Sequence, residues 1–300
     1  MKVAILGSRG GWHEARLADA LRARGVVPVV VPITRLVGRL GDSTGLSAQD
    51  ERLEECAAVL VRAIPAGSLE QVIFRVDALH RLTRMGVPVI NSPRCIERSV
   101  DKYLTSSLLR DGGLPTPRTI VCERFEDAMT AFEELGGDIV LKPLFGAEGR
   151  GMVRISDADI AYRTCRALEL SRSIFYLQAY VAHGDRDVRA FVVGDRVVAA
   201  MTRHGNGWKT NVAQGARVER VNLSPELVEL AVRGARLLEA DYAGVDLLPR
   251  DGGGVFVLEV NGIPGWQGLQ RTTEVDLAGA IADHVVTCAR RRVGNEAGRA

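Results

Sequence analysis

The chain has 300 residues, of which 46% are hydrophobic, and its 39 basic and 37 acidic residues leave a formal net charge of +2. This balance excludes a global electrostatic attraction to nucleic acid or to a membrane, so we expect neither as a partner. The five cysteines stand far apart, without a C-x-x-C pair or a His-Cys cluster, which argues against zinc and against a disulfide framework.

Short apolar runs alternate with helical patterns over the first hundred residues. The first run, residues 3–6, is too short for the core of a secretory signal, and no stretch of 18 apolar residues follows. We therefore expect a cytoplasmic protein. Strands separated by helices indicate a parallel sheet. The expected strands are 3–6, 26–31, 56–61 and 87–90, with a helix at 14–24 and an exposed glycine-rich loop at 38–48.

The rest of the chain reads as a second and a third region of mixed helices and strands. Ser99 can cap a helix that Gly112 and Pro115 end. Gly194 and Asp195 form a good hairpin turn between two strands. The expected strands are 139–142, 153–155, 176–177, 189–193, 197–201, 243–250 and 255–261, with a helix at 225–239 and a polar, flexible tail after residue 290.

Two strands near the C-terminus, AGVDLLPR and VFVLEVNG, flank the loop DGGG. We expect Arg250 to pair with Val255 across this loop. Antiparallel register then places Asp246 opposite Glu259, with Asn261 on the same face. Two opposed carboxylates call for a counter-charge, and Mg²⁺ is the simplest candidate because it takes oxygen ligands. The alternative is a slipped register in which an arginine pairs with Glu259.

A glycine-rich segment, IVLKPLFGAEGRGM, follows a strand that ends in Lys142. The spacing of Gly146, Gly149 and Gly151 allows backbone N–H groups to turn toward phosphate oxygens, and the lysine supplies a point charge. The segment matches neither the Walker pattern nor a dinucleotide fingerprint. A flexible hairpin turn is the alternative interpretation.

A strand-like run, FYLQAYV, holds one polar residue, Gln178, and is followed by DVRAFVV. Extended backbone beside an apolar wall can meet an adenine edge. Asp187 and Arg189 share a face of the next strand, where they could serve ribose and phosphate. The alternative for these two residues is a surface ion pair, worth about 0 to 1 kcal/mol.

These segments, in this order, resemble the ATP-grasp superfamily and, within it, the RimK-like amino-acid ligases. The motifs are NSPRCIERSVDKYLTSSLL, VLKPLFGAEGRG, LQAYV, DVRAFVVGDRVVAAM, AGVDLL and LEVNGIPG. The resemblance covers residues 1 to about 284 and implies an α/β, multidomain ATP-grasp fold. Its expected parts are an N-terminal Rossmann-like parallel-sheet domain at 1–95, a central lid at 96–185, a C-terminal subdomain with the metal site at 186–290 and the tail at 291–300.

By this resemblance, two lysines and a mobile glycine-rich flap hold the triphosphate of ATP. The lysines are Lys102 and Lys142, and the flap comprises Gly146, Glu148, Gly149 and Gly151. Asp246, Glu259 and Asn261 are similar to the ligands of a divalent cation, Mg²⁺ or Mn²⁺.

The same resemblance implies a hinge that meets adenine through its backbone, formed by Gln178, Ala179 and Tyr180. Asp187 is similar to a polar residue near the ribose, and Arg189 to an arginine that reaches the phosphates. Ala179 stands where relatives commonly carry an acidic residue, so we expect altered nucleotide affinity and not loss of binding.

The expected acceptor pocket differs from that of ribosomal-protein glutamate ligases. Arg203 and Asn211 resemble polar residues that face the reacting carboxylate, but the segment between them is short and carries Lys209. Trp266 is a candidate wall of this pocket or a packing residue. Arg62 is a candidate carboxylate clamp or a surface arginine.

The resemblance implies that ATP phosphorylates a carboxylate and that an amine then attacks the acyl phosphate. Lys142 and Arg203 would stabilise the charges that develop, and His204 is the histidine to test for proton transfer. The expected enzyme joins L-glutamate or another amino acid to a carboxylate acceptor, which is a small cofactor precursor or a protein C-terminus. Relatives are often dimers or tetramers. The alternatives are a nucleotide-binding regulator without catalysis and ligation with a D-amino acid.

Overall fold

The computed structural model describes residues 1–41, 44–146 and 149–297. Its N-terminal part is built on a sheet of order β2-β1-β6-β7, and all its pairings are parallel, which confirms the parallel sheet expected there. A capping box at Ser68 and Gln71 begins the second helix. The elements are β1 (Lys2–Leu6), α1 (Trp12–Arg22), β2 (Val27–Val31), β6 (Ala58–Val61), α2 (Leu69–Arg84) and β7 (Val89–Ile90).

The stretch expected to be an exposed loop at 38–48 instead forms most of a small antiparallel sheet. Residues 42–43 lie outside the described part, but Leu46 and Ala48 are buried in the N-terminal core, so the second half of the expected loop is a buried strand. Glycines in the segment interrupt the alternation of apolar and polar residues from which a strand is predicted. The strands are β3 (Leu36–Arg39), β4 (Gly45–Ala48) and β5 (Glu51–Arg52), with 3₁₀ turns at Ile33–Arg35 and Leu53–Glu55.

Two short helices, α3 (Pro93–Val100) and α4 (Lys102–Asp111), replace the single helix expected from residue 99. Ser92 caps the first, and the Asp101 carboxylate accepts the Leu104 N–H at 3.0 Å to cap the second. The expected cap, Ser99, lies inside the last turn of α3. This break places Lys102 at the very start of α4.

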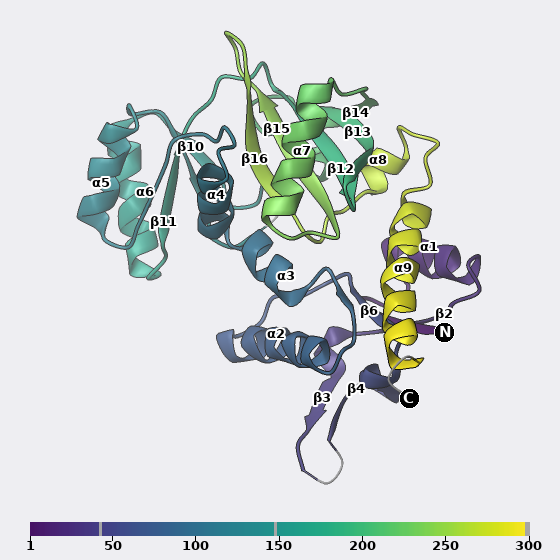
Figure 1. Cartoon of the computed structure of the whole chain (residues 1–300). Helices are drawn as coiled ribbons and strands as arrows, with labels where there is room; N and C mark the ends of the chain where they lie inside the picture. Colours follow the sequence, from purple (N-terminus) through teal and green to yellow (C-terminus); the bar gives the residue numbers. More distant parts are fainter. Residues whose placement is uncertain (42–43, 147–148, 298–300) are drawn as a thin grey trace.

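The lid is an antiparallel sheet of order β10-β9-β11-β8 with two helices packed against it (Figure 1). Ile139, Leu141 and Phe175 pack against these helices to form its core. The first strand, β8, was not expected. The elements are β8 (Thr119–Cys122), α5 (Phe125–Glu134), β9 (Ile139–Lys142), β10 (Val153–Ile155), α6 (Ala158–Leu170) and β11 (Phe175–Ala179).

The C-terminal sheet has the order β14-β13-β12-β15-β16, and α7 lies against it (Figure 1). Leu109 of α4 and the nearby Leu114 belong to the core of this sheet, so α4 packs against the C-terminal part. The lid expected at residues 96–185 included α4. The elements are β12 (Arg186–Val193), β13 (Arg196–His204), a 3₁₀ turn at Val212–Gln214, β14 (Arg217–Arg220), α7 (Pro225–Leu237), β15 (Tyr242–Pro249), β16 (Val255–Asn261) and α8 (Gln267–Gln270).

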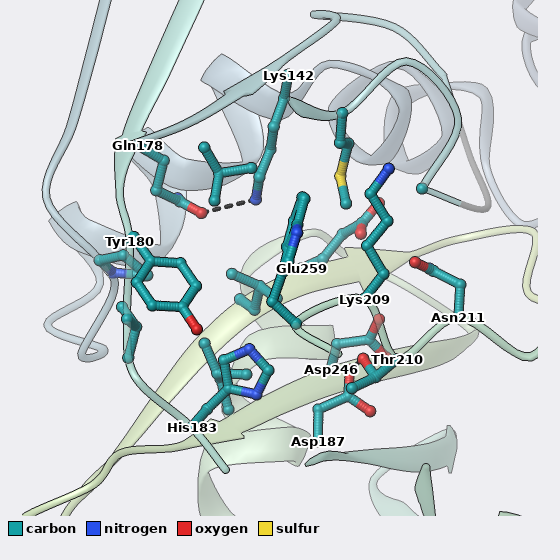
Figure 2. Close-up of a pocket in the computed structure, with 18 of the residues that line it drawn as sticks. Lys142, Gln178, Tyr180, His183, Asp187, Lys209, Thr210, Asn211, Asp246 and Glu259 are labelled. Carbon is teal, nitrogen blue, oxygen red and sulfur yellow. Dashed lines mark hydrogen bonds between the residues drawn. The ribbon is translucent and has the colours of Figure 1, made fainter. Parts of the chain in front are cut away.

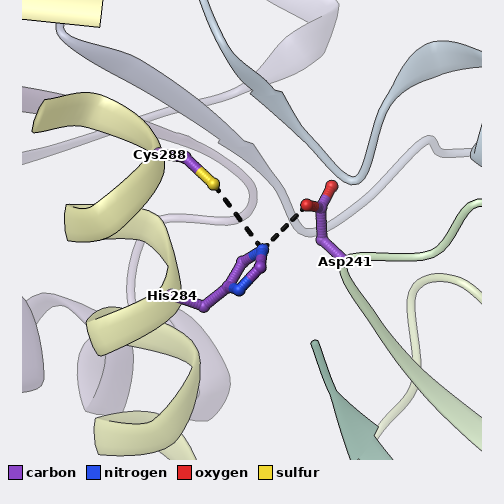
Figure 3. Close-up of side chains that lie close together, drawn as sticks. All are labelled: Asp241, His284 and Cys288. Carbon is purple, nitrogen blue, oxygen red and sulfur yellow. Dashed lines mark hydrogen bonds and ion pairs between the residues drawn. The ribbon is translucent and has the colours of Figure 1, made fainter. Parts of the chain in front are cut away.

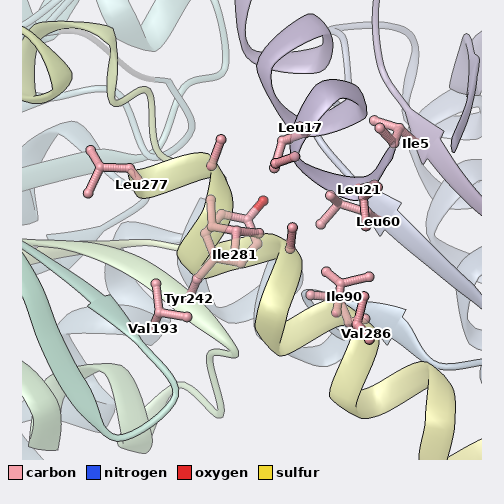
Figure 4. Packing of buried hydrophobic residues seen from close by; sticks show 14 of the residues in the cluster. Ile5, Leu17, Leu21, Leu60, Ile90, Val193, Tyr242, Leu277, Ile281 and Val286 are labelled. Carbon is pink, nitrogen blue, oxygen red and sulfur yellow. The ribbon is translucent and has the colours of Figure 1, made fainter. Parts of the chain in front are cut away.

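The last helix, α9 (Leu277–Ala297), returns to the N-terminal part and lies beside α1 (Figure 1). Its residues Leu277 and Ile281 share one core with Leu17 of α1 and Tyr242 of β15 (Figure 4). The stretch expected to be a flexible tail is therefore helical as far as Ala297. Among the described residues, no helix is both long enough and apolar enough to cross a membrane.

Candidate active site

A cavity that is partly open to solvent lies between the lid sheet and the C-terminal sheet (Figure 2). Its walls come from the start of α4, the end of β9 with the glycine-rich segment, the end of β11, and strands β12, β13, β15 and β16. The expected site residues that line it are Lys102, Lys142, Gly146, Gly149, Gln178, Ala179, Tyr180, Asp187, Arg203, Lys209, Asn211, Asp246 and Glu259.

Lys142 is half-buried at the end of β9, where its Nζ donates to Gln178 Oε1 at 2.6 Å (Figure 2). Burial lowers the pKa of Lys142 to about 8, although the negative charge of Glu259 opposes this shift. Gln178 is fixed in turn, because its Nε2 donates to Thr119 Oγ1 at 3.0 Å. Among the described residues no carboxylate contacts the half-buried ammonium group of Lys142, so this group is suited to an anionic ligand.

Lys102 reaches the cavity from the first turn of α4. Its Nζ donates to the carbonyl oxygens of Gly146 (2.8 Å) and Leu144 (3.4 Å), so it ties α4 to the glycine-rich segment. Gly149 has a φ of 69°, and a Cβ placed on it would meet Asn211 Oδ1 at 2.3 Å. Any other residue at this position would strain the backbone and displace the Asn211 amide, so glycine suits this close approach between the lid and the loop after β13.

Asp246 and Glu259 lie opposite each other on β15 and β16, which confirms the expected carboxylate pair. The register beyond them differs from the expectation, because Pro249 and not Arg250 pairs with Val255. A bulge at Leu258 compensates for this one-residue difference. The bulge also lets Leu258 line the cavity together with its neighbour Glu259, which a regular strand does not permit.

Four charged side chains form a network beside the cavity. Arg203 donates through Nε to Asp187 (2.6 Å) and pairs with Asp246 through an NH2 group (2.9 Å). Arg189 donates to both oxygens of Asp246 at 2.7 Å. Burial alone would raise the pKa of Asp246, but the two arginines outweigh it and lower the pKa to about 2. Two arginines therefore supply a counter-charge to Asp246, the carboxylate for which a divalent cation was predicted.

Glu259 and Asn261 complete a cluster of oxygen atoms around Arg189. In the amide orientation that satisfies its neighbours, Asn261 donates to Glu259 Oε1 and accepts from Arg189 NH2, each at 3.2 Å. Within the described residues, this amide is the only hydrogen-bond partner of Glu259. Carboxylate and amide oxygens are hard ligands of the kind that Mg²⁺ prefers, so the donor set fits this ion.

The backbone of the expected adenine hinge is only partly available for hydrogen bonds to a ligand. The N–H groups of Ala179 and Tyr180 donate to the carbonyls of Arg118 and Asp138, each at 2.9 Å. Val181 lines the cavity, and its backbone takes part in no hydrogen bond with the rest of the described chain. The backbone available to a ligand thus lies one residue beyond the expected hinge.

Several expected residues lie elsewhere. Trp266 is 1% exposed and packs in the core against His13 and Phe191, so it walls no open pocket. Arg62 is buried with its guanidinium 4.9 Å from the centre of the Trp266 ring, and it is not a surface arginine. His204 contacts Glu219 at 2.9 Å, away from the cavity. Glu148 lies outside the described residues, and Gly151 does not line the cavity, although its neighbours Arg150 and Met152 do.

Some lining residues had no clear signal in the sequence. Met152, Val140 and Leu248 form apolar walls, and His183 and Thr210 reach the cavity from loops (Figure 2). Thr210 donates to Asp187 at 2.6 Å, next to the Arg203 contact. In the sequence, only the position of Thr210 after Lys209 in a polar loop indicated that it could belong to the site.

A half-buried lysine, a glycine-rich segment and an acidic pair, which meet between a lid sheet and a C-terminal sheet, are typical of the class of ATP-grasp ligases. The RimK-like ATP-grasp domain matches residues 99–285, and the chain belongs to this family. The chain is an ATP-dependent ligase of the amide-forming kind, as expected from its motifs.

Two curated relatives and one solved structure illustrate the family. The tetrahydromethanopterin:alpha-L-glutamate ligase of Methanococcus maripaludis is 30% identical over 295 residues, which cover 97% of this chain and 99% of the relative. The same enzyme of Methanocaldococcus jannaschii is 39% identical over 220 residues, covering 71% and 75%. The ATP-grasp ligase PsnB, in complex with a minimal precursor, Mg and ADP, is 25% identical, with a TM-score of 0.73 over 96% of this chain and 98% of PsnB.

Proposed function

We propose that this enzyme joins L-glutamate to a carboxylate of a small cofactor-like acceptor, with ATP and Mg²⁺. The observation that carries the proposal is the convergence of Lys102, Lys142 and Glu259 on one cavity between the lid and the C-terminal sheet. The names of the two relatives, which match along most of their length, support glutamate as the amino acid. Each of them acts on a pterin that its name identifies.

The nucleotide would occupy the cavity with its base toward Val181 and its phosphates toward the lysines. Val140, Met152 and Leu248 offer an apolar wall to adenine, and the free backbone of Val181 offers a donor and an acceptor to its edge. Lys142 would exchange its bond to Gln178 for a phosphate oxygen. Charge complementarity makes this exchange favourable, because a phosphate is a stronger partner for an ammonium group than a neutral amide is.

Glu259, Asn261 and Asp246 would hold Mg²⁺. The ion supplies neutralisation of the triphosphate charge when it is bound. Glu259 is the ligand that the structure leaves most available, whereas Asp246 is engaged by Arg189 and Arg203. Arg189 lies among all three oxygen-bearing side chains.

The reaction would proceed through an acyl phosphate. The acceptor carboxylate attacks the γ-phosphorus and ADP leaves; the amine of glutamate then attacks the acyl carbon, and phosphate leaves after the amine loses a proton. Arg203 would stabilise negative charge on the transferred group, since its guanidinium is fixed by Asp187 and Asp246. Asp187 is fully engaged in this role, so we assign it to positioning Arg203 and not to a ribose contact.

The acceptor pocket would open beside the loop that follows β13. Lys209 and Asn211 line the cavity there and are suited to an acceptor carboxylate (Figure 2). Arg62 and Trp266 are buried away from it and receive no role. A dimer or tetramer remains a prediction from the family.

Incubation of the enzyme with ATP, Mg²⁺ and isotopically labelled L-glutamate, with tetrahydromethanopterin as the probe acceptor, tests the proposal. We expect a product heavier by one glutamyl residue, and ADP in equal amount. A second arm replaces the pterin with a peptide, because PsnB binds a precursor peptide. Labelling of the peptide alone, or ADP release with no labelled product, would overturn the assignment of a small acceptor. No ADP above background with any substrate would favour a nucleotide-binding regulator.

A further inference from the structure

A cluster of side chains of the types that can ligate a metal lies outside the cavity described above. Asp241 precedes β15, and His284 and Cys288 stand one turn apart on α9 (Figure 3). The Nε2 atom of His284 is 2.8 Å from Asp241 Oδ1 and 3.6 Å from Cys288 Sγ. A nitrogen, a sulfur and an oxygen atom thus lie within 4.8 Å of one another.

The hydrogen bond between His284 and Asp241 satisfies those two side chains but not Cys288. Both partners approach the same ring nitrogen, and an imidazole nitrogen carries at most one proton. A catalytic Cys-His-Asp triad needs the thiol and the carboxylate on opposite nitrogens, which this geometry excludes. The Nδ1 side of His284 instead faces Gly194, whose Cβ position would lie 3.7 Å from it. One metal ion at Nε2 would serve all three side chains at once.

We propose that Asp241, His284 and Cys288 bind one Zn²⁺ ion. Imidazole, thiolate and carboxylate form a borderline ligand set that suits Zn²⁺ and disfavours the hard Mg²⁺ ion. Bonds of about 2.1 Å to nitrogen and 2.3 Å to sulfur give tetrahedral N–S and N–O separations of roughly 3.3 to 3.6 Å. The Cys288 contact already has this length, and the Asp241 contact needs to open by about half an ångström.

The surroundings of the three side chains allow an ion to enter and hold Asp241 in place. The side chains of His284 and Asp241 are 27% and 26% exposed, so water can complete the coordination. The backbone N–H of Asp241 donates to Asn91 Oδ1 at 2.6 Å, which anchors the oxygen ligand to the N-terminal part. None of the three ligands lines the nucleotide cavity.

The ion would fasten α9 to the start of β15. Ile281 and Val285 of α9 pack in the core shared by the N-terminal and C-terminal sheets, so the site would stabilise the junction between them. This role does not depend on the proposed reaction. From the sequence we considered C-x-x-C pairs and His-Cys clusters but did not weigh the spacing H-x-x-x-C, which places His284 and Cys288 on one helix face.

Titration of the metal-free protein with Co²⁺, a spectroscopic substitute for Zn²⁺, tests the proposal. We expect one equivalent to produce a thiolate-to-cobalt charge-transfer band, which Zn²⁺ abolishes and Mg²⁺ does not. Zn²⁺ should also raise the melting temperature of the wild-type protein. Absence of the band in the wild-type protein, or a band that Mg²⁺ removes, would overturn the proposal without any variant.

Two cysteine variants locate the ion. Cys288→Ser should lose the charge-transfer band and the rise in melting temperature, whereas Cys122→Ser, a change at another half-buried free cysteine, should keep both. A band that persists in Cys288→Ser or vanishes in Cys122→Ser would place the ion elsewhere and contradict the assignment. These measurements do not involve ADP formation, so a result that overturns the zinc site does not bear on the proposed ligase activity.

Discussion

Asp187 holds Arg203 in a bidentate ion pair at the cavity wall, with Arg203 Nε 2.6 Å from Asp187 Oδ1. The pair is buried, with both side chains 3% exposed, and Thr210 donates a further hydrogen bond to the same carboxylate. Asp187 therefore has little capacity left for a ligand, and its effect on the reaction passes through Arg203.

Asp187→Asn should lower kcat by about 100-fold, because it frees a guanidinium that must be positioned before the transition state. The Kd for ADP should stay within about twofold, which isothermal titration calorimetry measures. Asp185→Asn, at an exposed position just before β12, is the matched control and should have wild-type kinetics. A large rise in the Kd for ADP with an unchanged kcat would instead place Asp187 at the ribose.

Glu259→Gln should reduce ADP formation by about 1000-fold or more, since charge neutralisation by a metal ion is worth several kcal/mol in phosphoryl transfer. The amide keeps the size of the side chain, and circular dichroism should show an unchanged fold. Glu274→Gln, an exposed glutamate outside the cavity, serves as the control. Turnover at the wild-type rate in Glu259→Gln would contradict the assignment of Glu259 as a ligand of Mg²⁺.

The affinity for nucleotide should fall as the pH rises through about 8, the lowered pKa of Lys142. Below this pH the lysine is charged and attracts phosphate; above it the free enzyme must take up a proton before it can bind, which weakens binding. Calorimetry of ADP binding between about pH 7 and pH 9, in buffers of different ionisation enthalpy, measures the proton uptake.

Lys142→Arg should bind ADP with little dependence on pH in this range, because a guanidinium stays charged. Lys142→Ala should bind weakly at every pH and raise the KM for ATP. Equal affinity of the wild-type enzyme at both ends of the range would show that Lys142 does not contact the phosphates.

Gly149→Ala should raise the KM for ATP by about tenfold or more. A residue with φ of 69° carries strain of roughly 1 to 3 kcal/mol when it is not glycine, and the added Cβ would lie 2.3 Å from Asn211 Oδ1. Gly25→Ala is the matched control, because Gly25 has a φ of 70° and open space around it. Equal kinetics for the two variants would show that the contact with Asn211 has no role.

The carboxylate pair could be predicted from sequence because two features of one hairpin fixed it. The glycine-rich loop identified the turn, and a residue count then placed Asp246 opposite Glu259, as the structure confirms. The count succeeded although the strand ends were misjudged by one residue, since the bulge at Leu258 restores the register. Periodicity in a sequence does not reveal a bulge.

The arginine network could not be predicted for the same physical reason. The turn at Gly194 and Asp195 was predicted correctly, and regular pairing from it places Asp187 opposite Thr202. A register shift after Phe191 moves the partner to Arg203. The contact between Arg189 and Asp246 depends further on β12 pairing with β15, which lies more than forty residues along the chain. Local patterns carry no information on that strand order.

The most direct test of the proposed reaction is ADP formation by the purified enzyme with ATP, Mg²⁺, L-glutamate and tetrahydromethanopterin, each omitted in turn. We expect multiple turnovers of ATP to ADP only in the complete mixture, with one glutamyl group transferred per ADP, and a rate at least about 1000-fold lower with Glu259→Gln. ADP formation that continues without Mg²⁺ after chelation, or that is equal in Glu259→Gln, would contradict it.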